Sequence, residues 1–167
     1  LYLGTWAMNN PPEERRDGRL LLNDGTGSFV DSGARLGHGR DVLTTLAFDN
    51  DLDGDSDLYL GHVHKVIGFV ETNPTADDVL YRNVDGELVD ETAASPRLGD
   101  DAWAAMGMDA GDLDNDGDLD LYVTDRWDID DPLPRGNPLY LNQGDGSFSD
   151  NACDAARVCT GHSGWPT

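Results

Sequence analysis

Short apolar segments that alternate with turns dominate the chain. The segments rich in β-forming residues lie at 43–48, 58–61, 104–110 and 121–124. Hairpin patterns, in which apolar arms flank a turn of Asn, Asp and Gly residues, lie at 20–31, 79–90 and 138–150. These turn residues accept the positive φ of tight hairpins. The pattern therefore predicts short antiparallel strands and an all-β fold.

The hairpin pattern returns with a period of about 60 residues. It places Asn23, Asn83 and Asn142 at equivalent positions, and the letters of Leu1–Gly4 are repeated at Leu58–Gly61. Four short strands per period predict the blades of a β-propeller, because such units bury their apolar faces only against neighbouring units. The second and third strands are apolar at consecutive positions, which is typical of sheets covered on both faces.

The repeat divides the chain into nearly three blades. We expect a partial blade without its first strand at 1–37, complete blades at 38–99 and 100–160, and the start of a further blade at 161–167. A closed propeller needs about four to eight blades. The chain is therefore expected to be a segment of a larger propeller, and completion by partner subunits is the alternative.

Two acidic loops precede the second strands of the two complete blades. Each has Asp at positions 1, 3, 5, 7 and 9 and Gly at position 6: Asp49, Asp51, Asp53, Asp55 and Asp57 with Gly54, and Asp112, Asp114, Asp116, Asp118 and Asp120 with Gly117. Such a turn, rich in oxygen ligands, is what Ca²⁺ requires. The loops predict two Ca²⁺ sites, with side-chain oxygens from positions 1, 3, 5 and 9 and a backbone carbonyl from position 7.

An EF-hand, a dockerin-like loop and an acidic turn without metal each share part of this pattern. An EF-hand has flanking helices and a Glu at position 12, where this chain has Leu60 and Val123 in short β-forming runs. A dockerin-like loop also leads into a helix, which Leu-Tyr-Leu and Leu-Tyr-Val open poorly. An acidic turn without metal would leave five carboxylates repelling one another within nine residues.

The phrase GDLDNDGDLDLYVTD followed by NPLYLNQGDGSFSD resembles the FG-GAP or VCBS repeat. This is the calcium-binding blade of integrin-α-like β-propellers and of bacterial and cartilage-acidic-protein-like variants. The resemblance implies one calcium ion between the first and second strands of each blade, held by the Asp residues of the two loops. The integrin relatives usually have seven blades, and this chain has fewer.

The charge of the chain limits its partners and its location. It has 11 Lys and Arg against 33 Asp and Glu, which gives a formal net charge of −22. This balance excludes nucleic acid and anionic membrane surfaces as partners. No apolar run is long enough to span a bilayer, so direct membrane insertion is not expected. Since millimolar calcium is found outside the cytosol, we expect an exported protein that is extracellular, at the cell surface or periplasmic.

Long connections between the second and third strands are the expected seat of partner binding, at 5–18, 62–78 and 124–137. Their aromatic and basic residues are candidates for contact, with local packing over blade edges as the alternative: Trp6, Arg15, Arg16, Lys65, Phe69, Arg126, Trp127 and Arg135. Trp103 and Trp165 recur at one repeat position and are expected to pack between blades.

Two smaller patterns involve His and Cys residues. His62 and His64 have a spacing that zinc can use, but no Cys or third His lies nearby, so a structural or exposed role is expected. Cys153 and Cys159 bracket a short connector. In an exported protein they would pair, and two free thiols are the alternative.

No catalytic constellation is evident, and we expect a protein that is not an enzyme. Neither a nucleophile elbow nor a phosphate-binding glycine loop is present, and the clustered carboxylates are assigned to metal. The expected function is adhesion, recognition of a protein or glycan ligand, or assembly with neighbouring subunits. The alternatives are an accessory propeller domain of a secreted enzyme, such as a carbohydrate-active one, and a structural subunit of a large surface assembly.

Overall fold

The computed structural model describes residues 1–4, 17–37, 41–63, 78–95, 98, 105–125 and 137–150. These residues form three sheets and one 3-10 turn, η2 (Thr92–Ala94). The first sheet contains β1 (Tyr2–Leu3), β2 (Gly18–Asn23) and β3 (Phe29–Leu36). The second contains β4 (Val42–Phe48), β5 (Asp57–His62), β6 (Val79–Val84) and β7 (Glu87–Asp90). The third contains β8 (Ala105–Gly111), β9 (Asp120–Asp125), β10 (Leu139–Asn142) and β11 (Phe148–Asp150).

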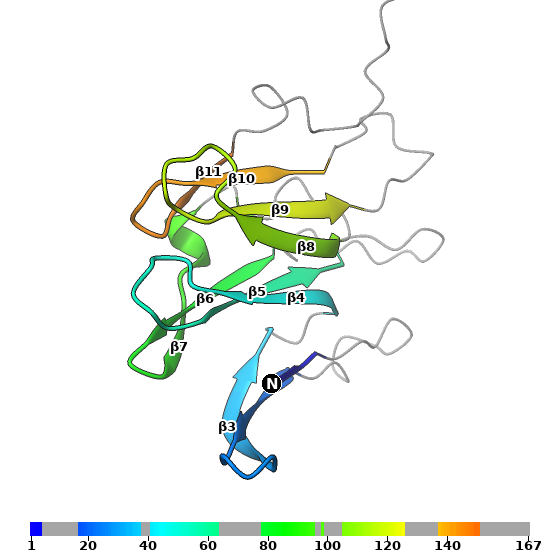
Figure 1. The fold of residues 1–167 in the computed structure, drawn as a ribbon. Coiled ribbons are helices and arrows are strands. Elements are labelled where there is room, and N and C mark those ends of the chain that lie inside the picture. Colours follow the sequence, from blue (N-terminus) through cyan, green and yellow to red (C-terminus); the bar gives the residue numbers. More distant parts are fainter. Residues whose placement is uncertain are drawn as a thin grey trace, which may run out of the picture.

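Each sheet is an antiparallel meander in which strands that follow one another in sequence are neighbours. Figure 1 shows the three sheets stacked one on another, with the second in the middle. The all-β prediction is confirmed, and the sheets are consistent with blades of a β-propeller. Within the described residues, no helix is long and apolar enough to cross a membrane.

The second and third sheets repeat the same local detail. In both, the pairing of the first strand with the second shifts register near the start of the first strand, between Val42 and Thr44 and between Ala105 and Gly107. In the first sheet β1 pairs with β2 as β5 pairs with β6. The recurrence of a bulge and of a strand pairing supports the repeat that the sequence predicts. The blade boundaries set from the sequence stay predictions.

Strand β5 is buried along its whole length because it lies between the other two sheets. Its side chains alternate, as strand geometry requires. Tyr59 packs in a cluster with Tyr140 of the third sheet, and Leu58 and Leu60 pack in a cluster with Leu36 of the first. The expectation that the second strand is covered on both faces is therefore confirmed for β5.

Close approach and hydrogen bonds fasten the sheets to one another. The backbone N–H of Gly37 donates to the Tyr81 hydroxyl at 3.0 Å, and the N–H of Phe148 donates to Ser95 Oγ at 2.8 Å. A Cβ added at Gly61 would lie 2.6 Å from the Cβ of Ala105 in the next sheet. The Leu-Tyr-Leu-Gly motif of β5 thus ends in Gly where the second and third sheets touch.

The hairpin turns use the predicted residues, with one correction. In the β6–β7 turn, Asp85 and Gly86 both have positive φ, at 53° and 90°. In the β2–β3 turn the positive φ falls on Gly25 and Gly27 instead of on the Asn-Asp pair. There Asn23 Oδ1 accepts the N–H of Gly25 at 2.8 Å, so the Asn holds the turn by its side chain rather than by its backbone conformation.

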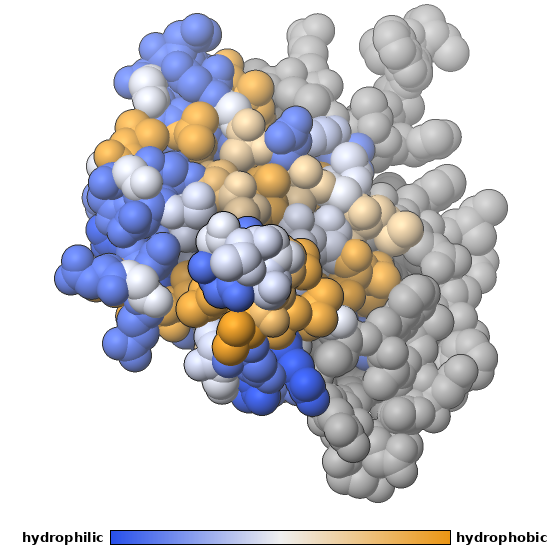
Figure 2. Space-filling model, turned by 60° about the horizontal axis from the view of Figure 1, so that its bottom comes forward, coloured by the Kyte–Doolittle hydropathy of each residue, from blue (hydrophilic) through white to orange (hydrophobic). Residues whose placement is uncertain are grey.

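The first sheet carries an exposed apolar surface. Figure 2, turned to bring the lower end of Figure 1 forward, shows hydrophobic residues gathered in the middle of this view and hydrophilic residues along one edge. Five large apolar residues are exposed here, in the first sheet or directly before it: Leu1, Leu3, Leu22, Phe29 and Val30. They lie on both faces of the first sheet, since Phe29 and Val30 are consecutive strand residues and Val30 shares its face with its partner Leu22. Within the described residues, the first sheet has a neighbouring sheet on one side only, whereas β5 is covered on both (Figure 1).

Several candidates from the sequence lie outside the described residues. They are Trp6, Arg15, Arg16, His64, Lys65, Phe69, Trp103, Arg126, Trp127, Arg135, Cys153, Cys159 and Trp165. Their predicted roles in partner contact, blade packing and disulfide pairing stay predictions. His62 lies within β5 and is fully buried, in agreement with the structural role expected for it.

Candidate metal centre

The two acidic loops follow the same backbone path at the same end of the stacked sheets (Figure 1). The loop at 49–57 joins β4 to β5, and the loop at 112–120 joins β8 to β9. Gly54 and Gly117 at position 6 have φ values of 99° and 102°, as the sequence predicts. Position 4 also has positive φ, 58° at Leu52 and 66° at Asn115. The sequence does not show this for Leu52, because Leu is an uncommon residue in that conformation.

Side chains inside each loop accept backbone hydrogen bonds from residues two positions later. Asp51 Oδ1 accepts the N–H of Asp53 at 3.3 Å, and Asp114 Oδ1 accepts the N–H of Asp116 at 3.2 Å. The bonds from Asp55 N–H to Asp53 and from Asp118 N–H to Asp116 repeat the pattern at 2.9 Å and 3.0 Å. The alternate spacing of Asp therefore shapes the loop as well as supplying oxygen atoms.

The carboxylate at position 9 ties each loop to the neighbouring strand. Asp57 is 1% exposed, and its two oxygens accept the N–H groups of Asn50 and Asn83, both at 2.7 Å. Asp120 is fully buried and accepts the N–H groups of Leu113 at 2.8 Å and Asn142 at 3.0 Å. Position 9 thus links the start of the loop to the third strand of its own sheet.

The recurring hairpin Asn completes this link from the other side. Asn83 Nδ2 donates to the carbonyl of Ser56 at 3.2 Å, and Asn142 Nδ2 donates to that of Leu119 at the same distance. Both carbonyls belong to position 8 of an acidic loop. The Oδ1 atoms of these two Asn residues accept N–H groups of their own turns, at Gly86 and Gly144. The loop and hairpin motifs recur together because they form one hydrogen-bonded unit.

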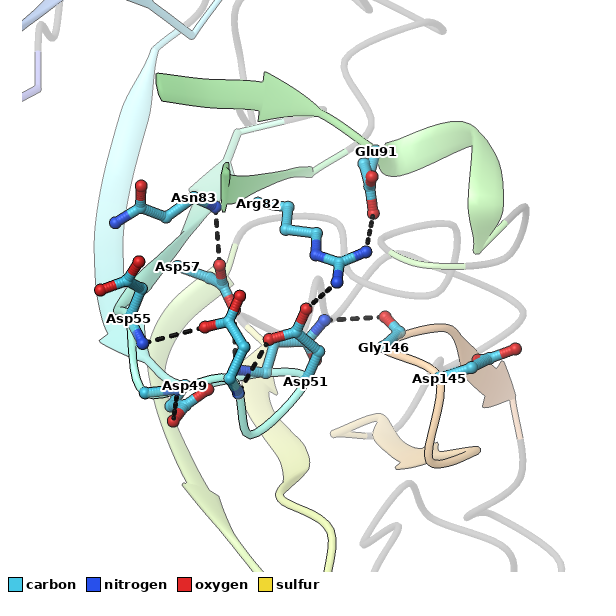
Figure 3. Close-up of polar contacts among 12 residues, drawn as sticks. Asp49, Asp51, Asp55, Asp57, Arg82, Asn83, Glu91, Asp145 and Gly146 are labelled. Atoms are coloured by element: carbon cyan, nitrogen blue, oxygen red, sulfur yellow. Dashed lines mark hydrogen bonds and ion pairs between the residues drawn. The ribbon is translucent and has the colours of Figure 1, made fainter. Parts of the chain in front are cut away.

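Three carboxylates gather in each loop. Oxygen atoms of Asp49, Asp51 and Asp57 lie within 4.8 Å of one another, as do those of Asp112, Asp114 and Asp116. The other predicted ligands, Asp53, Asp55, Asp118 and Asp120, are not part of these groups. Figure 3 shows the side chains of the first loop and the contacts that hold them.

The residues of the first loop fit a hard cation. Asp49 Oδ2 accepts the N–H of Gly54 at 3.0 Å, while Asp49 Oδ1 is buried and has no hydrogen-bond partner within the described residues. A buried carboxylate oxygen without a donor is costly, and a cation would satisfy it. Calcium takes oxygen ligands of this kind, so the donor set agrees with the predicted ion.

Loss of solvation, together with the crowding of acids, raises the pKa of one Asp in each loop. Burial raises the pKa of Asp57, and the carboxylates of Asp51 and Asp53 add to the rise against the opposing backbone N–H bonds. Loss of solvation raises the pKa of Asp114, with further contributions from the charges of Asp116 and Asp120. In each case the ionised form is disfavoured, and a bound cation would favour it.

The first loop is fastened to the neighbouring sheet through Asn50. Asn50 Nδ2 donates to the carbonyl of Gly146 in the β10–β11 turn at 2.7 Å, and Asn142 Nδ2 donates to the carbonyl of Asn50 at 2.7 Å. The second loop has Leu113, which is 55% exposed, at the position of Asn50. Loop 49–57 is therefore hydrogen-bonded to a second sheet, whereas the hydrogen bonds of loop 112–120 among the described residues stay within its own sheet.

Two polar groups of the second sheet were not singled out from the sequence: one beside the first acidic loop and one at the opposite end of β5. Arg82 of β6 forms an ion pair with Asp51 and lies 3.8 Å from Glu91 (Figure 3). Asp78, directly before β6, is fully buried and accepts the Tyr59 hydroxyl at 2.9 Å and the His62 N–H at 2.7 Å. Neither contact follows from a local motif, because both depend on strand pairing and packing.

Comparison with known proteins supports part of the resemblance found in the sequence. Residues 66–123 match the model of the FG-GAP-like repeat family. The matched range contains β6 to β8, the acidic loop at 112–120 and the start of β9, and it does not include the loop at 49–57. The chain matches none of the curated proteins and none of the solved structures with which it was compared. The chain therefore contains an FG-GAP-like repeat at residues 66–123.

Proposed function

We propose that the chain is a calcium-stabilised β-propeller module of an exported protein that is not an enzyme. In this proposal two Ca²⁺ ions bind, one in each acidic loop. The module serves adhesion, recognition of a protein or glycan ligand, or assembly with neighbouring subunits. The subtype is the integrin-α-like propeller that the loop and hairpin motifs resemble.

The observation that carries the proposal is the paired geometry of the two loops. Each brings three carboxylates within 4.8 Å of one another on a backbone with positive φ at the same two positions. In the first loop, Asp49 Oδ1 is buried without a hydrogen-bond donor in the described part of the chain. The repeated loop conformation and carboxylate clusters favour a shared ligand over two independent surface turns, although the groups use positions 1, 3 and 9 in the first loop and the exposed positions 1, 3 and 5 in the second.

The residues that would hold the ions follow from these groups. Asp49, Asp51 and Asp57 would hold the first, and Asp112, Asp114 and Asp116 the second. The remaining acids, Asp53, Asp55, Asp118 and Asp120, stay candidate ligands from the sequence. A bound ion supplies positive charge that offsets the repulsion among carboxylates. An ion that orders the loop would also stabilise the third strand of the sheet, because Asp57 and Asp120 accept backbone N–H groups of that strand.

The proposed location and partners rest on the repeat family and on the surface of the chain. FG-GAP repeats usually occur in extracellular or surface proteins, which agrees with a calcium-dependent fold in an exported protein. The exposed apolar residues of the first sheet support assembly with further blades or subunits. The formal net charge of −22 disfavours nucleic acid as a partner.

Equilibrium dialysis against calcium tests the proposed sites. The chelator-treated chain is expected to bind two ions. The pair Asp49→Ala with Asp51→Ala and the pair Asp112→Ala with Asp114→Ala are each expected to leave one, because each removes two carboxylates of one group. Glu87→Ala, an exposed acid of β7, is the control and should keep two. A stoichiometry that the paired substitutions leave unchanged would place the ions elsewhere and refute the proposal.

A further inference from the structure

The two acidic loops differ in one contact. In loop 49–57, Asp51 of position 3 forms an ion pair with Arg82. In loop 112–120 the equivalent carboxylate is Asp114, and no ion pair reaches it among the described residues. The residue that precedes the hairpin Asn is Arg82 in the second sheet and Leu141 in the third. The repeat therefore has a cation in contact with the first candidate site and an apolar residue, Leu141, at the equivalent strand position in the third sheet.

The Arg82 contact is held in place by its surroundings. Asp51 is only 5% exposed and Arg82 is 32% exposed, so solvent screens the pair less than it screens a surface ion pair. Asp51 Oδ1 accepts the Asp53 N–H, whereas Oδ2 makes the ion pair with Arg82 and has no hydrogen-bond donor within the described residues. Glu91 lies 3.8 Å from the other terminal nitrogen of Arg82, which is within ion-pair distance but too long for a hydrogen bond (Figure 3).

We propose that Arg82 makes the two loops unequal, so that loop 49–57 binds a divalent cation more weakly than loop 112–120. This inference rests on the calcium function proposed above. A guanidinium on a shared carboxylate repels an incoming cation and occupies one of its oxygen ligands. It also partly neutralises the first loop before any ion binds. The second loop has no arginine in contact with its carboxylates among the described residues, so only a bound ion would offset their repulsion.

The proposed difference in calcium affinity also affects the contact between the second and third sheets. Loop 49–57 is the loop that reaches the β10–β11 turn through Asn50 and Gly146. Because Arg82 supplies one positive charge, part of the repulsion among the carboxylates of loop 49–57 stays offset when calcium is scarce, and the contact between the second and third sheets is kept. Loop 112–120 has neither such an arginine nor a hydrogen bond to another sheet among the described residues, and it would lose its order first.

Calorimetric titration with calcium chloride, each time with one loop disabled, measures the effect. With Asp112→Ala and Asp114→Ala, only loop 49–57 remains, and Arg82→Leu is expected to raise its calcium affinity at least tenfold, or about 1.4 kcal/mol. With Asp49→Ala and Asp51→Ala, only loop 112–120 remains, and Leu141→Arg is expected to lower its affinity. The second arm stands even if Arg82→Leu does not fold.

A second arginine, Arg19, provides a control for the loss of charge. Arg19→Leu removes the same charge from an exposed side chain of β2 and should leave the affinity of loop 49–57 within about twofold, because salt screens distant surface charge. An affinity that Arg82→Leu lowers or leaves unchanged overturns the inference, since Arg82 would then orient Asp51 for the ion or act only on the fold. If neither loop binds calcium, the proposed function itself fails. If both loops bind calcium and neither Arg82→Leu nor Leu141→Arg changes the affinity, the proposed function stands and only the proposed role of Arg82 fails.

Discussion

Replacing Asp120 by Ala is expected to lower the free energy of unfolding by about 3 to 5 kcal/mol. Each hydrogen bond to a charged group contributes about 1.5–3 kcal/mol, and a buried donor left unpaired adds its desolvation cost. Asp120 is fully buried and accepts two backbone N–H groups, from Leu113 and Asn142. The substitution therefore releases both the start of the acidic loop and the third strand. Urea denaturation in the presence of a chelator measures the loss apart from any bound ion.

Two companion variants show whether the loss comes from these hydrogen bonds. Asp120→Asn keeps one carbonyl oxygen as an acceptor and should lose roughly half as much as the Ala variant. Glu87→Ala removes an exposed acid and should change stability by less than about 0.5 kcal/mol. Equal effects of Asp120→Ala and Glu87→Ala would contradict the role given to position 9.

Replacing Asp78 by Ala is expected to cost about 2 to 4 kcal/mol, the second large effect. Its carboxylate accepts the Tyr59 hydroxyl at 2.9 Å and the His62 N–H at 2.7 Å, and all three residues are fully buried. Burial raises the pKa of Tyr59 well above its ordinary value, and the charge of Asp78 adds to the rise. The hydroxyl therefore stays protonated and needs an acceptor that Ala does not offer.

A double-mutant cycle with Tyr59→Phe separates this contact from general damage to the core. Because Phe has no hydroxyl to leave unpaired, Asp78→Ala should cost less in the Tyr59→Phe background, with a coupling of about 0.5–3 kcal/mol. Thermal or urea unfolding of the four proteins gives the coupling. Additive effects would show that the two side chains do not act together and would contradict the assigned hydrogen bond.

Features that depend on neighbouring residues in the sequence were predictable. Turn residues and apolar runs located the strands of the hairpins, because positive φ and strand burial leave local patterns. The period of about 60 residues indicated stacked units, and the order of strands in the three sheets confirms an all-β fold of this kind. The Asp spacing located both acidic loops, although their calcium ions stay a proposal.

Features that depend on packing were not predictable. Asn50 meets Gly146 across 96 residues of sequence, and no pattern in either segment indicates the partner. Arg82 forms its ion pair because β6 places it beside the acidic loop. In the sequence, the only sign of this contact is that the equivalent residue of the next repeat is Leu141 instead of Arg. Asp120, a predicted ion ligand, also accepts two backbone N–H groups, and the Asp spacing alone does not show this second role.

The dependence of stability on calcium tests the central claim most directly. An ion that binds only the folded chain stabilises it by about 2.7 kcal/mol per site at a concentration one hundred times its dissociation constant. Urea denaturation of the whole chain should therefore show an unfolding free energy about 5 kcal/mol higher in saturating calcium than in chelator. Calcium should also stabilise the chain more than an equal concentration of magnesium, which prefers a tighter octahedral site. An unfolding free energy that is the same in calcium and in chelator would contradict the account.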